Sequence, residues 1–364
     1  MFVYMPDLLN VAAVVIVLAL SFRGHGYWAW VTGAALALDA WFIGGVDSPE
    51  MFRIIIAIFS LTAILFGVRG LRRAIITNPL MGLIARKMPV MGETERIALE
   101  AGTVWWDGEL FSGKPDWHKL LDFKIQPLSP QEQAFLDGPV DELCHMLNDW
   151  QIANDRDLPP EVWDFIKRQG FFGMIIPKDF GGLGFSAQMH SCVVAKLASR
   201  SVTAAVTVMV PNSLGPGELL IHYGTDEQKQ YYLPRLASGQ DIPCFALTEP
   251  NAGSDAASGQ SRGVVCRGRW KNEDVLGMML TFNKRYITLA PVATVIGLAF
   301  RLYDPDHLMG EIDDIGITCA LLPHDTPGLQ TGLRHDPMGV PFQNGPVTGV
   351  DVFVPLHFII GGPE

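Results

Sequence analysis

CFALTEPNAGSDAAS, residues 244–258, is the stretch of the chain that decides its fold. It collects small oxygen-bearing residues around one Pro and one Gly, and it contains no Lys or Arg. Such residues favour a surface turn. They equally suit a loop that holds a cofactor through hydroxyl and backbone N–H groups instead of basic side chains. The stretch alone leaves both interpretations open.

Helix signals precede this stretch and strand signals follow it. Ser129-Pro130-Gln131-Glu132 combines an N-cap, a first-turn proline and a capping box, and apolar positions continue at helical spacing to Leu147. Further helices are predicted at 161–168, at 186–199, within 202–223 and from 225 onward. Short apolar runs that alternate with turns predict strands at 264–270, 275–282, 285–288, 295–302, 317–322 and 351–354. The order predicts an α+β fold, with a helical domain at 129–240 and an antiparallel β-domain at 241–364.

Three apolar runs lie near the start of the chain, at 6–22, 27–46 and 52–68. Each approaches the roughly 20 residues that cross a bilayer. A signal peptide is excluded because residues 1–7 contain no Lys or Arg. The pattern predicts a membrane region at 1–76 with about three transmembrane helices, followed by a connector at 77–128. The alternative is that these runs are buried helices of a soluble protein. Asp39 within the second run argues against a complete transmembrane helix there, because a charged side chain in the bilayer is costly.

Basic residues follow the third apolar run, at Arg69, Arg72, Arg73, Arg86 and Lys87. By the positive-inside rule this side of the membrane is cytoplasmic. The formal net charge of −11 argues against a nucleic-acid partner. The five cysteines lie far apart without zinc-ligand spacing, so no metal site is predicted.

Five motifs then occur in a characteristic order: PKDFGGLGF at 177–185, YGTDEQKQYYLPRLASGQ at 223–240, ALTEPNAGSD at 246–255, NKRYIT at 283–288 and GPVTGVDVFVP at 345–355. Together they resemble the acyl-CoA dehydrogenases, and the resemblance covers about residues 130–364. With the apolar start and the connector VWWDGELFSGKPDW, the chain is most similar to the long membrane-associated bacterial acyl-CoA dehydrogenases of fatty-acid β-oxidation. That resemblance implies that the protein is located in the cell inner membrane, with its catalytic part on the cytoplasmic side.

The resemblance implies that residues 245–254 line one side of a bound FAD. Phe245 belongs to this lining, and Thr248 with the backbone of Leu247 would hydrogen-bond the flavin ring. Gly253 and Ser254 would supply donors to the pyrophosphate, which explains the missing Lys. Ser254 would also touch the acyl-CoA substrate.

The second flavin segment is NKRYIT. Tyr286 stands where the family usually has a Trp against the isoalloxazine, so an aromatic face is kept but the indole N–H is lost. Thr288 would hydrogen-bond the ring. Without the resemblance, both would be ordinary strand residues. Asp255 is expected to fix the preceding loop through local backbone bonds.

The implied reaction is FAD-dependent α,β-dehydrogenation of an acyl-CoA thioester, with electron-transfer flavoprotein as the electron acceptor. The resemblance also implies a homo-oligomeric enzyme. The family's base is a Glu in a C-terminal helical bundle. That bundle is expected to lie beyond Glu364 and to be absent from this chain, so no catalytic residue is assigned. Glu249 and Glu218 are not expected to replace it. The alternatives are a catalytically incomplete, membrane-anchored module that binds flavin or acyl-CoA, and a flavin oxidase or monooxygenase of the same superfamily.

Overall fold

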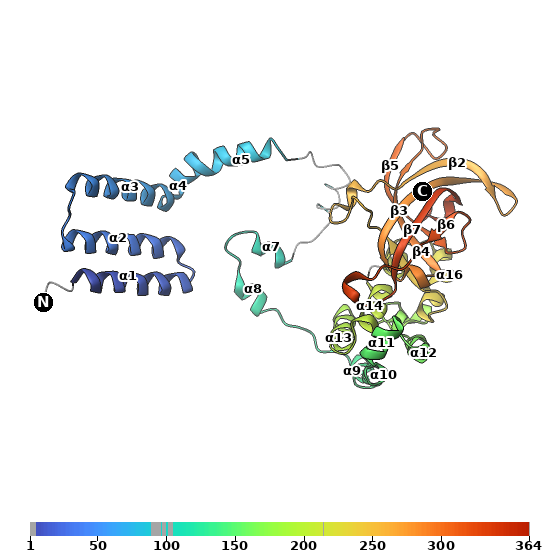
Figure 1. Ribbon diagram of the computed structural model, residues 1–364. Helices are drawn as coiled ribbons and strands as arrows, with labels where there is room; N and C mark the ends of the chain where they lie inside the picture. The colour runs from blue at the N-terminus through green and yellow to red at the C-terminus, as the bar shows by residue number, and fades with distance from the viewer. Residues whose placement is uncertain (1–4, 89–95, 97–99, 101–104, 214, 364) are drawn as a thin grey trace. The chain divides into compact units, whose positions relative to one another are not determined.

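A computed structural model describes residues 5–88, 96, 100, 105–213 and 215–363 (Figure 1). The chain divides into two compact units, residues 1–91 and 92–364, which are described separately. Parts of the predicted connector, at 89–95, 97–99 and 101–104, lie outside the described residues.

Three long helices that lie side by side make up most of the first unit (Figure 1). They are α1 (Met5–Phe22), α2 (Gly26–Gly44) and α3 (Pro49–Gly67), followed by α4 (Arg69–Arg72), the π-helical turn η1 (Arg73–Thr77) and α5 (Asn78–Ala85). The Tyr27 hydroxyl donates to the Ala63 carbonyl at 2.9 Å and links α2 to α3. Large apolar side chains still face outward, as Leu18 (65% exposed) and Leu61 (68%) show.

Within the described residues, α1 and α3 are long and apolar enough to cross a membrane, judged by length and composition. The helix α2 does not meet the same criterion, and it carries Asp39. The three spans predicted from the sequence therefore stay a prediction.

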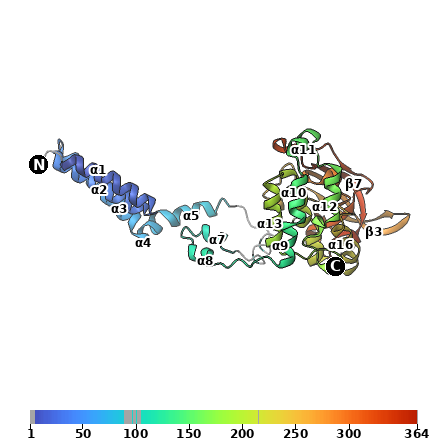
Figure 2. The same ribbon diagram turned by 90° about the horizontal axis from the view of Figure 1, so that it is seen from below.

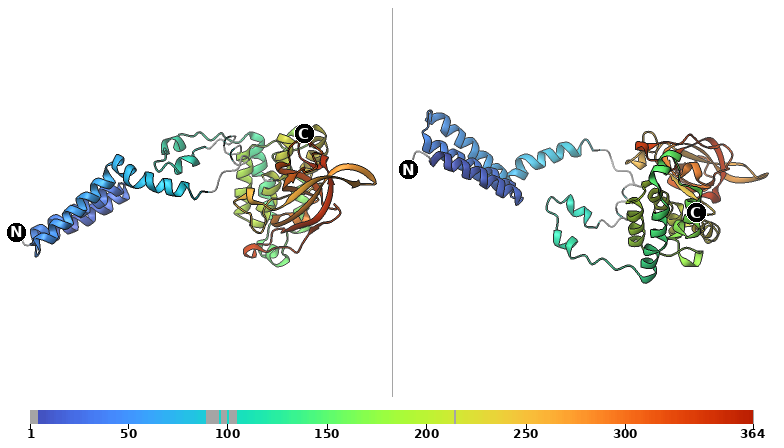
Figure 3. Two further views of the ribbon diagram at one scale, coloured as in Figure 1. Left: turned by 90° about the horizontal axis from the view of Figure 1, so that it is seen from above. Right: turned by 60° about the horizontal axis from the view of Figure 1, so that its bottom comes forward.

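The second unit contains two short helices, a helical domain and a β-domain. The helices are α7 (Asp107–Leu110), α8 (Trp117–Leu121), α9 (Pro130–Asp137), α10 (Pro139–Met146), α11 (Asp149–Asp155), α12 (Pro160–Arg168), α13 (Ala187–Ala198), α14 (Val202–Met209), α15 (Pro216–Tyr223) and α16 (Asp226–Ala237). From α9 onward they form one layer, and the strands form another (Figure 2, Figure 3).

Two predicted helices are divided in the structure. The helix predicted from Ser129 to Leu147 breaks between α9 and α10, where Gly138 has non-helical torsion angles and Pro139 has no N–H to continue the ladder. The segment 202–223 likewise contains both α14 and α15. The predicted capping boxes are confirmed at Ser129–Glu132 and at Thr225–Gln228.

The β-domain is one sheet of seven strands in the order β1-β4-β2-β3-β7-β6, with β5 paired to β4. The strands are β1 (Pro243–Ala246), β2 (Arg262–Trp270), β3 (Glu273–Thr288), β4 (Val295–Tyr303), β5 (Asp314–Pro323), β6 (Leu329–Thr331) and β7 (Asn344–Pro355). The predicted antiparallel sheet is wrong for two pairs, because β1 and β2 both run parallel to β4. The remaining pairs are antiparallel.

Strands β1 and β2 share one edge of β4. β5 pairs along the whole of Val295–Tyr303 and occupies the other edge. β1 therefore pairs with 295–298, and β2 pairs further along with 301–303. Between these two pairings only Ala299 and Phe300 of β4 remain, whereas the connecting chain is residues 247–261. This connecting chain must therefore leave the sheet and return to it. This topology makes the quoted stretch a protruding loop at a fixed place.

One continuous core of buried side chains joins the helical layer to the sheet, for example Phe165 and Met189 with Leu280 and Val354. Two side-chain amides also cross between the layers. The Gln228 amide on α16 donates to the Ile359 carbonyl at 2.7 Å. The Gln343 amide before β7 donates to a carboxylate oxygen of Asp157 at 2.7 Å. The helical layer and the sheet therefore pack together through both apolar and polar contacts.

Candidate functional site

The protruding loop, residues 247–261, is closed at its neck by Glu249. The backbone groups of Glu249 and Ala252 exchange two hydrogen bonds, N to O at 2.9 and 3.3 Å, which form a tight turn. The carboxylate of Glu249 accepts from the backbone N of Gln260 at 2.5 Å and of Ser261 at 3.0 Å, at the far end of the loop. One buried side chain therefore fixes both ends of the loop.

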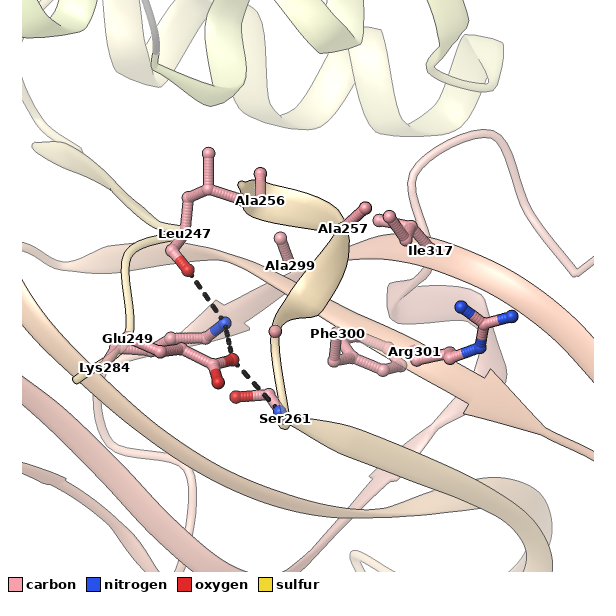
Figure 4. A pocket seen from close by; sticks show the side chains of 11 residues that line it. Leu247, Glu249, Ala256, Ala257, Ser261, Lys284, Ala299, Phe300, Arg301 and Ile317 are labelled. Atoms are coloured by element: carbon pink, nitrogen blue, oxygen red, sulfur yellow. Dashed lines mark hydrogen bonds and ion pairs between the residues drawn. The ribbon is translucent and has the colours of Figure 1, made fainter. Parts of the chain in front are cut away.

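Lys284 on β3 lies beneath this neck (Figure 4). Its ammonium donates to a Glu249 carboxylate oxygen at 2.8 Å and to the Leu247 carbonyl at 3.1 Å. The Lys284 side chain is 2% exposed and that of Glu249 is 6% exposed. This is a buried, hydrogen-bonded ion pair, so removing either partner leaves the other charge without compensation.

The local environment keeps Glu249 ionised. Burial by itself raises the pKa of its carboxyl, but hydrogen bonds from Lys284 and from the backbone of Ser261 and Gln260 outweigh burial and lower the pKa to about 2. A carboxylate that is ionised at neutral pH, paired with Lys284 and this weakly basic is a poor acceptor for a substrate proton. This geometry supports the expected structural role of Glu249.

Acid should weaken the folded state through Glu249. Because its folded pKa lies below the ordinary value of 4.5, the stabilisation is complete above about pH 4.5 and is lost as the pH falls toward 2. We expect the denaturant concentration at the midpoint of unfolding, measured by tryptophan fluorescence, to fall as the pH is lowered from about 4.5 toward 2. Glu249→Gln should flatten that fall, whereas Glu161→Gln, at an exposed position of α12, should not. Equal slopes for both variants would contradict the assignment.

The cavity beneath Ala256 and Ala257 is too small for an organic ligand, whereas a hollow beside Pro250 and Asn251 measures about 380 Å³. The cavity between the loop and the strands measures only about 20 Å³ and is lined by Ala256, Ala257, Ala299 and Phe300 among others (Figure 4). Such a volume holds about one water molecule. Within the described part of the chain, the amide and hydroxyl of Thr248 have no hydrogen-bond partner, and neither do the amides of Gly253 and Ser254.

A β-bulge in β3 brings the second predicted segment to the loop. Lys284 pairs with Val347 and Ile287 with Gly345, so one extra residue is accommodated between them. The Arg285 amide consequently donates to the Thr248 carbonyl at 2.9 Å instead of to β7. Tyr286 adopts a left-handed conformation (φ 57°) with its side chain 56% exposed. A bulky residue at positive φ is rare and is tolerated only where the surroundings fix it.

Asn344 supplies that support for Tyr286. Its amide donates to the Tyr286 carbonyl at 3.1 Å and to the Thr288 hydroxyl at 3.3 Å. The His335 ring packs against the Tyr286 ring with centroids 4.8 Å apart. The buried Asn344 Oδ1 and His335 Nε2 have no hydrogen-bond partner within the described residues. The exposed aromatic side chain of Tyr286, held from behind by Asn344 and His335, is the surface that a planar ligand could cover.

Leu247, Thr248, Tyr286 and Thr288 are thus brought together by contacts between the loop, the bulge and Asn344. The ring of Phe245 lies over Gly297, where a Cβ would stand 3.0 Å from the Phe245 Cδ2 atom. Gly253 and Ser254 lie on the exposed part of the loop.

Asp255 was expected to fix this loop through local backbone bonds, and its carbonyl does accept from the Ser258 amide at 3.3 Å and from the Ser258 hydroxyl at 2.8 Å. The neck of the loop, however, is closed by Glu249. Sequence reasoning also missed Lys284, Asn344 and His335. For Lys284 a signal existed, because it follows Leu280 and Phe282 at alternate positions on the buried face of a strand.

Comparison with known proteins identifies both layers of the second unit. The family model described as acyl-CoA dehydrogenase, N-terminal domain, matches residues 138–240. The model described as acyl-CoA dehydrogenase, middle domain, matches residues 244–351. Together they cover more than half of the chain and include the loop, the bulge and Asn344.

Individual relatives cover less of the chain. The very long-chain specific acyl-CoA dehydrogenase of Rattus norvegicus mitochondria is 30% identical over 229 residues, which are 62% of this chain and 33% of that protein. Protein HemX of Proteus mirabilis is 58% identical over 66 residues, 18% of this chain and 39% of that protein. The chain thus spans less than half the length of these curated relatives.

A solved structure with a similar fold is the FAD complex of PigA. It has a TM-score of 0.54 at 24% identity and covers 65% of this chain and 60% of that one. Both domain models match in the family's order, and the fold agrees with them. The chain therefore belongs to the acyl-CoA dehydrogenase family.

Proposed function

We propose that the chain binds FAD on the outer side of the loop 247–261 and serves the α,β-dehydrogenation of acyl-CoA thioesters. The observation that carries this proposal is that the donors at Thr248, Gly253 and Ser254 have no partner among the described residues, and that Thr248 adjoins the bulge that exposes Tyr286. The donors suit the uncharged edge of a ring and a pyrophosphate without any Lys or Arg. The residues present therefore fit the cofactor that the family implies.

Bound FAD would supply the acceptor for the hydride that leaves the β-carbon of the substrate. The chain's own residues would position it. The Thr248 amide and hydroxyl would donate to the ring edge, Tyr286 would cover the ring, and the Thr288 hydroxyl, held by Asn344, would face the ring. Gly253 and Ser254 would hold the phosphates. Glu249 would keep the loop closed and would not act as the base, because it is paired to Lys284.

An anaerobic titration tests the reaction class. The FAD-loaded chain in detergent is mixed with a long-chain saturated acyl-CoA, and the flavin absorbance and 2-enoyl-CoA are measured. The proposal expects the acyl-CoA to perturb the flavin spectrum. Bleaching with 2-enoyl-CoA would locate the base within this chain, and perturbation alone would locate it elsewhere. An unchanged spectrum at saturating acyl-CoA would contradict the proposal.

Gly253 offers a prediction that separates ligand binding from folding. Its φ is not positive, and a Cβ at this position would meet no protein atom within 4 Å, so the fold itself does not require glycine here. We expect Gly253→Val to change the free energy of unfolding by less than about 0.5 kcal/mol. The same variant should weaken FAD binding by about tenfold or more, because the side chain would occupy the space of the cofactor.

Gly310 provides the matched control, since a Cβ there also meets nothing within 4 Å and its φ is not positive. It lies between β4 and β5, outside the loop and the bulge. Gly310→Val should leave FAD binding unchanged. Equal FAD affinities for the two variants would argue against the loop as the pyrophosphate site.

The membrane is proposed as the location of the first unit. The outward apolar side chains of α1 and α3 support this, because helices that are apolar on their exposed faces are stable in a lipid environment. The basic residues from Arg69 to Arg73 support a cytoplasmic position for the following domain at the inner membrane, by the positive-inside rule. The chain should resist extraction from membranes by alkaline carbonate, and release into the supernatant would contradict this location.

The electron acceptor is proposed to be an electron-transfer flavoprotein. The family assignment supports this, because a dehydrogenase must pass the electrons of its reduced flavin to a separate acceptor. Reoxidation of the reduced flavin by such a flavoprotein, and not by dissolved oxygen, would support a dehydrogenase. Rapid reoxidation by oxygen would favour the oxidase alternative.

A further inference from the structure

The Leu247–Thr248 peptide group lies between a buried cation and the proposed cofactor surface. At one end, the Leu247 carbonyl accepts from the Lys284 ammonium at 3.1 Å (Figure 4). At the other end, the Thr248 amide finds no acceptor in the residues that the structure describes. The carbonyl of Thr248 is fixed as well, because it accepts from the Arg285 amide at 2.9 Å.

The direction of the free Thr248 N–H follows from the geometry of the peptide bond. A trans peptide group is planar, so its C=O and N–H bonds point in opposite directions, and the described chain contains no cis peptide. Because the Leu247 carbonyl points inward to Lys284, the Thr248 N–H points outward. An acceptor for this N–H would therefore bind on the side of the peptide group opposite Lys284, away from the cavity of about 20 Å³ beneath the loop.

A cation on the carbonyl also strengthens the N–H at the other end of the same amide. The Lys284 bond is charge-assisted, and hydrogen bonds in a chain polarise one another through the groups that they share. Groups far from the ion pair feel little net charge, because the Glu249 carboxylate lies 2.8 Å from the Lys284 ammonium (Nζ to Oε1). The direct contact to the Leu247 carbonyl remains, so the effect is confined to this one amide.

We propose that Lys284 is a positioning residue that polarises the Leu247–Thr248 amide and thereby strengthens and aims the Thr248 N–H at the flavin. This inference rests on the proposed function, because the flavin is what the N–H would face. A stronger donor stabilises the electron density that the ring gains on reduction. Lys284 thus acts on the flavin potential through one peptide group and without touching the cofactor.

The test uses a signal of the chain that exists without flavin. In the full chain labelled with ¹³C-carbonyl Leu and ¹⁵N Thr, only Leu–Thr peptide bonds give a coupled signal, at Leu61–Thr62, Leu247–Thr248 and Leu280–Thr281. Thr248→Ser removes and so assigns one of them. Lys284→Met should move the Thr248 ¹⁵N signal upfield, because its preceding carbonyl loses a charge-assisted bond, with Thr62 as the unaffected reference.

The double variant Lys284→Met/Glu249→Gln guards against misfolding, because it leaves no unpaired buried charge. It should show the same upfield shift. With FAD bound, it should lower the two-electron equilibrium constant for reduction by about tenfold, which corresponds to about 30 mV. Glu249→Gln alone keeps the Lys284–Leu247 contact and should retain the Thr248 signal position.

The outcomes separate this inference from the proposed function. An unchanged Thr248 signal in a folded double variant, or an unchanged potential with FAD bound, would overturn the role of Lys284 while the flavin site stands. Absence of FAD binding by the unaltered chain would overturn the proposed function, and with it the role of Lys284 toward a flavin, even if the amide signal shifts.

Discussion

Glu249→Ala should destabilise the second unit by about 3–5 kcal/mol, the usual cost of leaving one charge of a buried ion pair without its partner. The variant leaves the Lys284 ammonium buried, with the Leu247 carbonyl as its remaining bond. It also removes the acceptor for the amides of Gln260 and Ser261. Chemical unfolding followed by tryptophan fluorescence measures the loss.

A double-mutant cycle shows whether the pair is the cause. Glu249→Ala/Lys284→Met should be more stable than the sum of the single variants predicts, because no charge then stays unpaired. The surface pair Arg301–Asp314 is the control, with side chains 38% and 44% exposed. Arg301→Gln should cost less than about 1 kcal/mol. If Glu249→Ala also cost less than about 1 kcal/mol, the proposal that the buried ion pair stabilises the loop would be contradicted.

Glu132→Ala should cost about 3 kcal/mol, because one buried carboxylate serves two helix starts. Its Oε2 accepts from the Ser129 amide at 2.8 Å and closes the capping box of α9. Its Oε1 accepts from the amide of Ser186 at 2.8 Å and from its hydroxyl at 2.6 Å, at the N-cap of α13. The Ser186 and Ser129 bonds outweigh burial and lower the pKa of Glu132 to about 2.

The measurement for Glu132 is the same unfolding titration, with Gln133→Ala on the same helix as control. Among the described residues the side chain of Gln133 bonds to Asp137 alone, at an exposed position, so Gln133→Ala should cost no more than about 0.5 kcal/mol. Amide exchange at Met189, whose N–H bonds to the Ser186 hydroxyl at 3.1 Å, should accelerate in Glu132→Ala alone. Equal destabilisation by the two variants would show that Glu132 is an ordinary surface cap.

The sequence contained enough to predict most elements of the second unit, because their signals are local. Capping residues and helical spacing located α12, α13 and α16, and β-branched runs located β2, β4 and β5. The misses have physical causes. β1 and β6 are too short, at four and three residues, to show a period, and pairing with β4 and β7 stabilises them. The break at Gly138 was readable in principle, since Pro139 follows it.

The parts of the candidate site that lie in sequence motifs could be predicted. The parts that depend on long-range strand pairing or on ion pairs between distant residues could not. Residues 245–254 and 286–288 were named from the family resemblance, and the structure places Thr248, Tyr286 and Thr288 around one bulge. The parallel pairing of β1 and β2 with one edge of β4, which expels the loop, is a long-range property that local patterns do not contain. The partnership of Glu249 with Lys284, 35 residues apart, is of the same kind.

An equilibrium titration of the full chain in detergent with FAD tests the central claim most directly. The unaltered chain should bind one FAD per polypeptide. Thr248→Val, which removes the hydroxyl that is proposed to donate to the ring edge, should bind FAD about tenfold more weakly, equivalent to one lost hydrogen bond of about 1.4 kcal/mol. Failure of the unaltered chain to bind FAD, or equal affinities for the two proteins, would contradict a flavin site on the outer side of the loop 247–261.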